Sequence, residues 1–223
     1  APAIKTGILN MESGIRNKIR ILQPEKLDST IFQITSQGLG SSKTANSKFD
    51  FAVVAAYAKI IPDEIINLFP HGIIGVHPSL LPKFRGPSPI QQAILDGEKK
   101  TGVTLYLIDK KVDNGPILSH ATCHMSHEYT YTILEEKLAR MAGELLVGIL
   151  PKFAEGKVKA TEQDHTKASF TKKFVTENGF VDLTKDKPEI IARKIRALNP
   201  EPGVYTIQNG LPAQAGTRLK LLE

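Results

Sequence analysis

Two short apolar runs indicate a fold built around a buried β-sheet. Residues 51–57 have the sequence FAVVAAY, preceded by Asp50, and residues 72–76 have the sequence GIIGV. Continuous apolar runs of this length are typical of strands covered on both faces in a parallel sheet. Helical patterns alternate with the strands along the chain. We therefore predict an α/β protein with a mostly parallel sheet and helices on both faces.

The segment between the second strand and the next helix has to be a structured loop. Pro78, Pro82 and Pro87 fall within eleven residues after that strand, and proline is excluded from helix interiors and central strands. The other predicted strands lie at 20–22, 103–108, 116–119 and 218–222. Predicted helices lie at 62–68, from a cap at Ser88 to Gly97, and before Asn199-Pro200, where the last one ends. A long amphipathic helix begins with a Thr132–Glu135 capping box and continues to Ile149 through Leu134, Leu138, Met141 and Leu145.

Composition narrows the class of protein. No apolar run approaches the 18 or more residues of a membrane-spanning helix. The single cysteine, Cys123, has no partner for an internal disulfide, which favours a reducing compartment such as the cytosol. The net charge of +6 is compatible with a polyanionic partner.

Three polar positions follow predicted strands. Tyr57-Ala58-Lys59 follows the first apolar run, His77 follows the second, and Asp113 lies in the turn after the third strand. Because ligands of open α/β sheets bind at the carboxyl ends of strands, we predict that His77 and Asp113 lie at one edge of the sheet, where they can pair. The structural alternatives are a core histidine and an ordinary turn aspartate; Arg85 is either a solvated charge or a ligand for an anionic group.

Three other kinds of site, namely a metal site, a phosphate-binding loop and a hydrolase nucleophile, do not fit the sequence patterns. His120, Cys123, His124 and His127 resemble metal ligands, but His120 and His124 in an extended segment stand about 13 Å apart, so we expect no metal site. The glycine-rich segment 38–44 matches neither common phosphate-binding motif. No serine lies in a hydrolase G-x-S-x-G context.

The central loop and its surroundings resemble a known enzyme family. Residues 77–97 have the sequence HPSLLPKFRGPSPIQQAILDG, followed by TGVT at 101–104 and DKKVDNGPIL at 109–118. This pattern is similar to that of the folate-dependent formyltransferases. The sequence RALNPEPG at 196–203 favours the methionyl-tRNA formyltransferases over the purine-pathway and sugar-amine enzymes.

The resemblance implies a domain organisation with a Rossmann-like catalytic domain. Residues 1–156 would form that domain without its opening strand, turn and helix, and residues 157–176 a linker. Residues 177–223 would form a hinge helix and the truncated start of a β-barrel-like, tRNA-binding domain. We expect a monomer in the cytoplasm or an organellar matrix.

The resemblance also implies a reaction. The formyl donor is 10-formyltetrahydrofolate and the acceptor is the amino group of initiator methionyl-tRNA, with no metal. His77, held protonated by Asp113, would stabilise the oxyanion, and Asp113 would take up the amine proton. Arg85 would orient the substrate. The folate-binding residues would be Tyr57, Ala58, Lys59, Ile60, Ser79, Leu80, Leu81, Pro82, Leu107, Ile108 and Val112.

One catalytic position departs from the family pattern. Family members place an asparagine two residues before the histidine, where it helps to hold the formyl oxygen, and this chain has Gly75. Losing one oxyanion donor typically costs about 10²- to 10³-fold in rate. Two alternatives therefore stay open: a formyltransferase that acts on a sugar nucleotide, and a catalytically impaired relic that binds folate or RNA.

Overall fold

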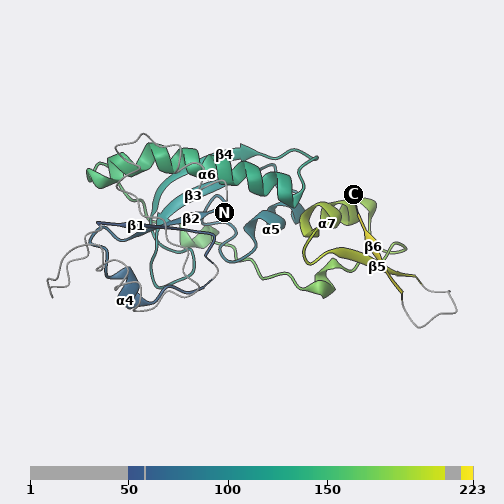
Figure 1. Ribbon diagram of the computed structural model, residues 1–223. Coiled ribbons are helices and arrows are strands. Elements are labelled where there is room, and N and C mark those ends of the chain that lie inside the picture. Colours follow the sequence, from purple (N-terminus) through teal and green to yellow (C-terminus); the bar gives the residue numbers. More distant parts are fainter. Residues whose placement is uncertain (1–49, 58, 209–216, 223) are drawn as a thin grey trace, which may run out of the picture.

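The computed structural model describes residues 50–57, 59–208 and 217–222. Four described strands, β1 (Ala52–Ala55), β2 (Ile73–His77), β3 (Lys100–Leu107) and β4 (Ile117–His124), form one sheet in that order (Figure 1). The strand expected at 20–22 and the glycine-rich segment 38–44 lie outside the described residues.

The α/β class is confirmed, but the described strands are less parallel than predicted. β1 pairs with β2 in parallel, whereas β2–β3 and β3–β4 are antiparallel. The short turn at 108–116 explains the last pairing, because a parallel connection needs a crossover of about a dozen residues or more. Both β3 and β4 are longer than expected.

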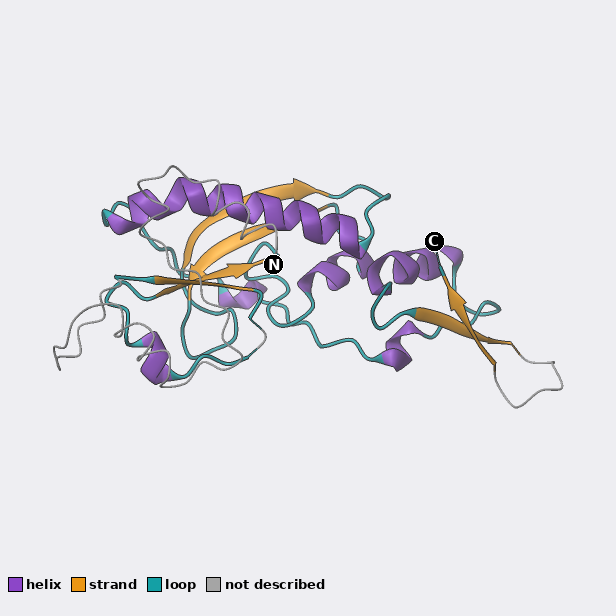
Figure 2. Ribbon diagram, in the orientation of Figure 1, coloured by secondary structure: helices purple, strands orange, loops and turns teal. Residues whose placement is uncertain are grey.

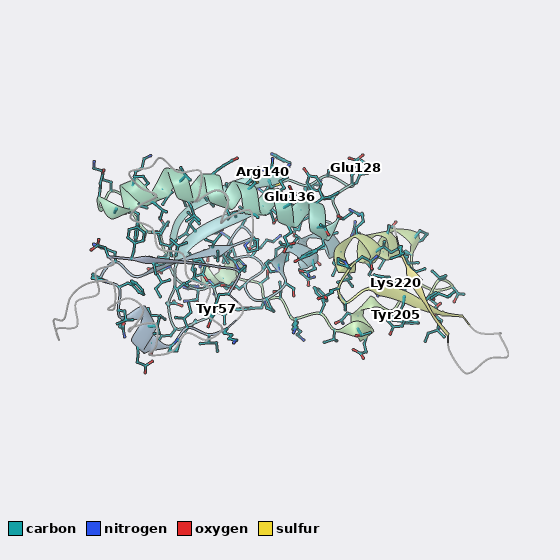
Figure 3. All side chains as sticks on the ribbon, in the orientation of Figure 1. Tyr57, Glu128, Glu136, Arg140, Tyr205 and Lys220 are labelled. Atoms are coloured by element: carbon teal, nitrogen blue, oxygen red, sulfur yellow. The ribbon has the colours of Figure 1, made fainter. Side chains whose placement is uncertain are left out.

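The long helix α6 (Tyr131–Ala154) packs against β3 and β4 and carries much of the core. Its N-cap is Thr130, whose Oγ1 accepts a hydrogen bond from Ile133 N, so the predicted cap at Thr132 was wrong. An ion pair between Arg140 and Glu136 lies on its outer face (Figure 3). The buried stripe of α6 follows steps of four and consists of Leu134, Leu138, Ala142, Leu146 and Leu150. The predicted Met141, Leu145 and Ile149 lie at its half-buried edge.

The remaining described helices are short. α4 (Asp63–Ile66) follows β1, and in Figure 1 it lies across the sheet from α6. α5 (Pro89–Leu95) begins at the predicted proline and packs against α6 and α7 (Pro188–Leu198). In the described part of the chain, no helix combines the length and apolar character needed to cross a bilayer.

The C-terminal part is joined to the main core. β5 (Val204–Gln208) and β6 (Thr217–Leu221) form an antiparallel hairpin beside α7 (Figure 2). The sequence predicted β6 but missed β5. Ala197, Leu198 and Val204 belong to the same buried cluster as the α6 stripe. The C-terminal part therefore packs against the part that contains the four-stranded sheet and α6.

The segment predicted as a linker, 157–176, also contacts the main body. Thr161 pairs with Ile117 at the start of β4, and Phe170 pairs with Arg85 in the proline-rich loop. One 3-10 helix, η1 (His165–Lys167), lies between these contacts, and a second, η2 (Thr176–Gly179), follows. The segment thus covers the loop that follows β2.

Candidate active site

The proline-rich loop after β2 is fixed by its own polar groups. Ser79 Oγ donates to Lys83 O at 2.6 Å, and Thr104 Oγ1 donates to Ser79 O at 2.7 Å. The same Thr104 Oγ1 accepts from Leu81 N at 3.1 Å. Because these bonds link the loop to β3, the residues around His77 have little freedom to move.

His77, the last residue of β2, lies at the base of this loop with 6% of its surface exposed. Its Nε2 is 2.8 Å from Phe84 O, and its Nδ1 is 3.5 Å from Asp113 Oδ2. A carbonyl oxygen only accepts hydrogen bonds, so Nε2 carries a proton. Nδ1 is therefore the nitrogen that gains or loses a proton beside Asp113.

Burial opposes the predicted charge on His77. Burial lowers the pKa of His77 below its ordinary value of 6.5, and the opposing effects of Asp113 and of the Phe84 carbonyl are smaller. A lowered pKa favours the neutral imidazole at pH 7, whereas the family resemblance implies a ring that Asp113 keeps protonated. The 3.5 Å separation is consistent with this result, because it is longer than a strong charge-assisted hydrogen bond.

Asp113 reaches His77 by a different route from the one predicted. β3 runs antiparallel to β2, and His77 pairs with Thr104 in the middle of β3, so the two strands do not end at the same edge. The turn after β3 instead folds back over the sheet. There Asp113 Oδ2 accepts from Gly86 N at 2.7 Å, and Oδ1 accepts from Tyr106 Oη at 2.6 Å.

Arg85 lies inside the protein, with 3% of its surface exposed. Its Nη2 lies 2.6 Å from Gln163 Oε1 and 2.9 Å from His165 Nδ1, and its Nη1 donates to Asn114 Oδ1 at 3.0 Å. Gln163 Nε2 in turn donates to Asp113 O at 3.0 Å. The guanidinium thus braces the Asp113 turn, and contact with a ligand would require these bonds to break.

Gly75 faces the ring of Tyr106 across the sheet. The two residues are direct partners between β2 and β3. A Cβ atom at Gly75 would lie 2.5 to 2.9 Å from Cε1, Cζ and Oη of the tyrosine, which is closer than such atoms approach. The ring of Tyr106 therefore occupies the space that a side chain at position 75 would need, and an asparagine there would overlap the ring.

A family assignment rests on comparison of the whole sequence with known proteins. Residues 35–150, more than half of the chain, match the sequence pattern of the family described as formyl transferase. The chain belongs to the formyl transferase family. The matched residues include His77, Asp113 and the proline-rich loop between them.

Relatives of this chain include two curated proteins named methionyl-tRNA formyltransferase. The one from Chloroflexus aurantiacus is 36% identical over 201 residues, covering 90% of this chain and 62% of that protein. The one from Thermotoga neapolitana is 40% identical over 161 residues, covering 72% of this chain and 51% of that protein. The chain thus spans between half and two thirds of the length of these relatives.

A solved structure shares the formyl transferase fold. HypX from Aquifex aeolicus, crystallised in complex with tetrahydrofolic acid, superposes with a TM-score of 0.64 at 25% identity. The match covers 72% of this chain and 28% of that protein. The Rossmann-like architecture expected from the sequence is therefore shared with a folate-binding protein of known structure.

The residues predicted to bind folate divide into two groups. Ser79 and Leu81 are buried in the proline-rich loop. Ala58 lies outside the described residues. The others lie at or near the surface: Tyr57, Lys59, Ile60, Leu80, Pro82, Leu107, Ile108 and Val112.

Two members of this set are largely exposed apolar residues. Ile60 is 84% exposed and Val112, which precedes Asp113 in the chain, is 55% exposed. An ion pair between Lys110 Nζ and Asp63 Oδ2, at 2.7 Å, joins the turn that holds Val112 to the helix that follows Ile60. Small-molecule sites in general combine apolar surface with a few placed polar groups.

The segment with His120, Cys123 and His124 is a strand, β4. His120 and His124 are exposed on it, and Cys123 is buried. Within the ranges that the structure describes, no three His, Cys, Asp or Glu residues are grouped closely enough to hold a metal ion.

Sequence reasoning missed two residues that contact the site. Tyr106 was assigned only to a strand, and Gln163 only to a linker. A signal for the first was present, since a glycine inside a strand often marks close approach of another group. No local pattern identifies Gln163, because its partners Arg85 and Asp113 lie far away in the sequence.

Proposed function

We propose that this chain transfers a formyl group from 10-formyltetrahydrofolate to the amino group of initiator methionyl-tRNA. The curated relatives named methionyl-tRNA formyltransferase, at 34 to 40% identity, support this substrate. The observation that carries the proposal is the convergence of His77 and Asp113, 3.5 Å apart, at the base of the proline-rich loop.

The donor, when bound, supplies a formyl carbon for attack by the amine; as the new C–N bond forms, the bond from that carbon to N10 of the folate breaks, and tetrahydrofolate leaves with a proton on N10. Asp113 would accept the proton that the attacking amine loses, directly or through a water molecule. Its Oδ2 lies beside His77 Nδ1, so the pair can share that proton within one site. A neutral imidazole suits this task, because Nδ1 then has a lone pair available.

Stabilisation of the formyl oxygen by His77 demands a further change. The Nε2 proton is engaged by Phe84 O, so the ring would have to exchange that carbonyl for the substrate oxygen. Donation from Nε2 to the developing oxyanion would then strengthen in the transition state, which is how such donors accelerate a reaction.

The same reading gives the proposed roles of the domains. Residues 1–156 would bind folate and hold the catalytic pair, with Ile60 and Val112 against the pterin. Residues 157–176 would connect this part to a C-terminal region that binds tRNA. We place the reaction in the cytoplasm or an organellar matrix, with the protein acting as a monomer.

The test is a formyl-transfer assay with purified protein and labelled 10-formyltetrahydrofolate. We expect formylated methionyl-tRNA, and we expect His77→Ala and Asp113→Ala each to reduce the rate by about 10²- to 10⁴-fold, the range for general acid–base catalysis. His120→Ala, a change at an exposed histidine on β4, is the matched control and should retain full activity.

Other outcomes would overturn the proposal. Formylation of an amino-sugar nucleotide without any of methionyl-tRNA would establish the sugar-directed alternative. Calorimetric binding of folate without transfer to either acceptor would establish a catalytically impaired relic. Full activity of His77→Ala would show that the catalytic pair is elsewhere.

A further inference from the structure

We propose that Tyr106 is a positioning residue for Asp113, and that the absence of a side chain at Gly75 is what admits it. The phenol would hold the carboxylate in the orientation in which Oδ2 meets His77. This inference rests on the proposed formyl transfer, since its consequences are measured in that reaction.

The first support is the fit between Gly75 and the ring. Tyr106 is buried on β3 directly opposite Gly75 on β2, and the ring occupies the space where a side chain on Gly75 would lie. A ring held against backbone in this way has few alternative rotamers. Its hydroxyl is consequently delivered to one place, the carboxylate of Asp113.

The second support is the distribution of bonds on the Asp113 carboxylate. Tyr106 Oη binds Oδ1 at 2.6 Å, and Gly86 N binds Oδ2 at 2.7 Å. With one donor on each oxygen, the carboxylate cannot rotate without losing both bonds. Oδ2 therefore stays turned toward His77 Nδ1.

Burial of the phenol, followed by the charge of Asp113, raises the pKa of Tyr106 above its ordinary value of 10. The hydroxyl thus keeps its proton at every pH used for assays and acts as a donor throughout. A donor to a carboxylate favours the ionised form, which is the form that accepts a proton from the amine.

Several charged or titratable groups surround this contact. His77 faces the carboxylate from β2 and Tyr106 faces it from β3. Asp109, in the same turn, acts on Tyr106 by its charge, and Arg85 reaches the turn through Asn114. Replacement of the phenol leaves these groups in place, so a changed pH profile would report the lost hydrogen bond.

The experiment compares Tyr106→Phe with the unmodified chain over a range of pH. We expect kcat to fall about 10- to 100-fold, the value of a hydrogen bond to a charged group, while KM for methionyl-tRNA stays unchanged. The pH profile of kcat is measured as well, because losing a hydrogen bond to the catalytic carboxylate should change that profile and a purely structural defect should not.

Tyr131→Phe is the matched control. Tyr131 also donates to a carboxylate, Glu135 Oε1 at 2.8 Å, but it does so at the start of α6. Its replacement should change neither kcat nor the pH profile. An equal effect of both variants would overturn the proposal, because the loss would then be a general consequence of removing a phenol.

A double-mutant cycle tests the role of Gly75. Gly75→Ala should displace the ring and reduce kcat about as much as Tyr106→Phe does. In a Tyr106→Leu background, where the ring is absent, Gly75→Ala should cost little more, so the two effects should not add. Additive losses would show that Gly75 acts independently of the tyrosine.

The outcomes separate this inference from the proposed function. An inactive unmodified chain that binds folate would contradict formyl transfer itself. An active chain whose Tyr106→Phe variant keeps its kcat and pH profile would contradict only the role of Tyr106. Circular dichroism of each variant at the assay temperature establishes that the chain is folded in either case.

Discussion

At the scale of single residues, the site depends on two backbone conformations that side chains disfavour. Phe84 has a φ of 60° and Asp113 a φ of 49°, both in the left-handed region. Phe84 supplies the carbonyl that binds His77, and Asp113 supplies the carboxylate. Such strained positions cost about 1–3 kcal/mol each, so neighbouring groups must hold them.

Gln163 is one of the groups that hold Asp113. We expect Gln163→Glu to reduce the rate of formyl transfer by about tenfold or more, because two buried donors to backbone carbonyls are lost. The new carboxylate would still accept from Arg85 but would repel Asp113 O and Gly115 O. The measurement is kcat at saturating substrates.

Glu144→Gln, the reverse exchange on the exposed face of α6, is the control for that variant and should leave the rate unchanged. Unchanged activity of Gln163→Glu would show that the Asp113 turn keeps its conformation without this amide.

The protonation of His77 makes stability depend on pH. Its pKa is lowered in the folded state, so the contribution is fully present above pH 6.5 and is lost as the pH falls through the folded value. Urea unfolding of the chain and of His77→Gln at pH 7.5 and 5.5 measures this. We expect acid to destabilise the unmodified chain more than the variant.

The opposite result would be informative about the mechanism. If the unmodified chain gained stability relative to His77→Gln at the lower pH, Asp113 would outweigh burial. The histidine would then be protonated in the folded protein, as the family resemblance implied.

At the scale of elements, the β3–β4 hairpin positions the turn that contains Asp113. Gly102 on β3 lies against β4 so closely that a Cβ atom would come within 2.1 Å of Ala121 O. The hairpin can approach this closely only because residue 102 has no side chain. Its register in turn fixes where the turn begins.

We expect Gly102→Ala to destabilise the fold by about 1–3 kcal/mol, since the backbone of β4 has to move. Gly148→Ala on the exposed face of α6 is the matched change, because a Cβ atom there meets nothing within 4 Å. It should stabilise by about 0.5–1 kcal/mol. Chemical denaturation midpoints check both, and equal effects would contradict the packing described for β4.

At the scale of the whole molecule, one buried cluster joins the sheet, α6, α7 and β5. Leu198, near the end of α7, is 1% exposed and belongs to the same cluster as Leu138 on α6. The C-terminal segment therefore contributes to the stability of the part that holds the catalytic pair.

Truncation of this side chain tests that coupling. Leu198→Ala should lower the free energy of unfolding by about 2–5 kcal/mol, as expected for a buried leucine. Far-ultraviolet circular dichroism and tyrosine fluorescence should report coincident transitions. Separate transitions would indicate that the two parts unfold independently.

The order of most elements and the identity of the proline-rich loop could be predicted from short stretches of the chain. Apolar runs, helical spacing and prolines act through local sterics and burial, and these are encoded within short windows. For this reason β1, β2, α5, α6 and α7 were predicted near their observed positions. His77 and Asp113 were likewise identified by their place in a long motif.

The way in which these residues meet could not be predicted from such local patterns. The antiparallel direction of β3, the fold-back of the Asp113 turn, the burial of Arg85 and the contact of Tyr106 with Gly75 all depend on pairings across the sheet. The charge of His77 belongs with them. Burial and neighbouring groups set its pKa, and neither is a property of the residue or of its neighbours in sequence.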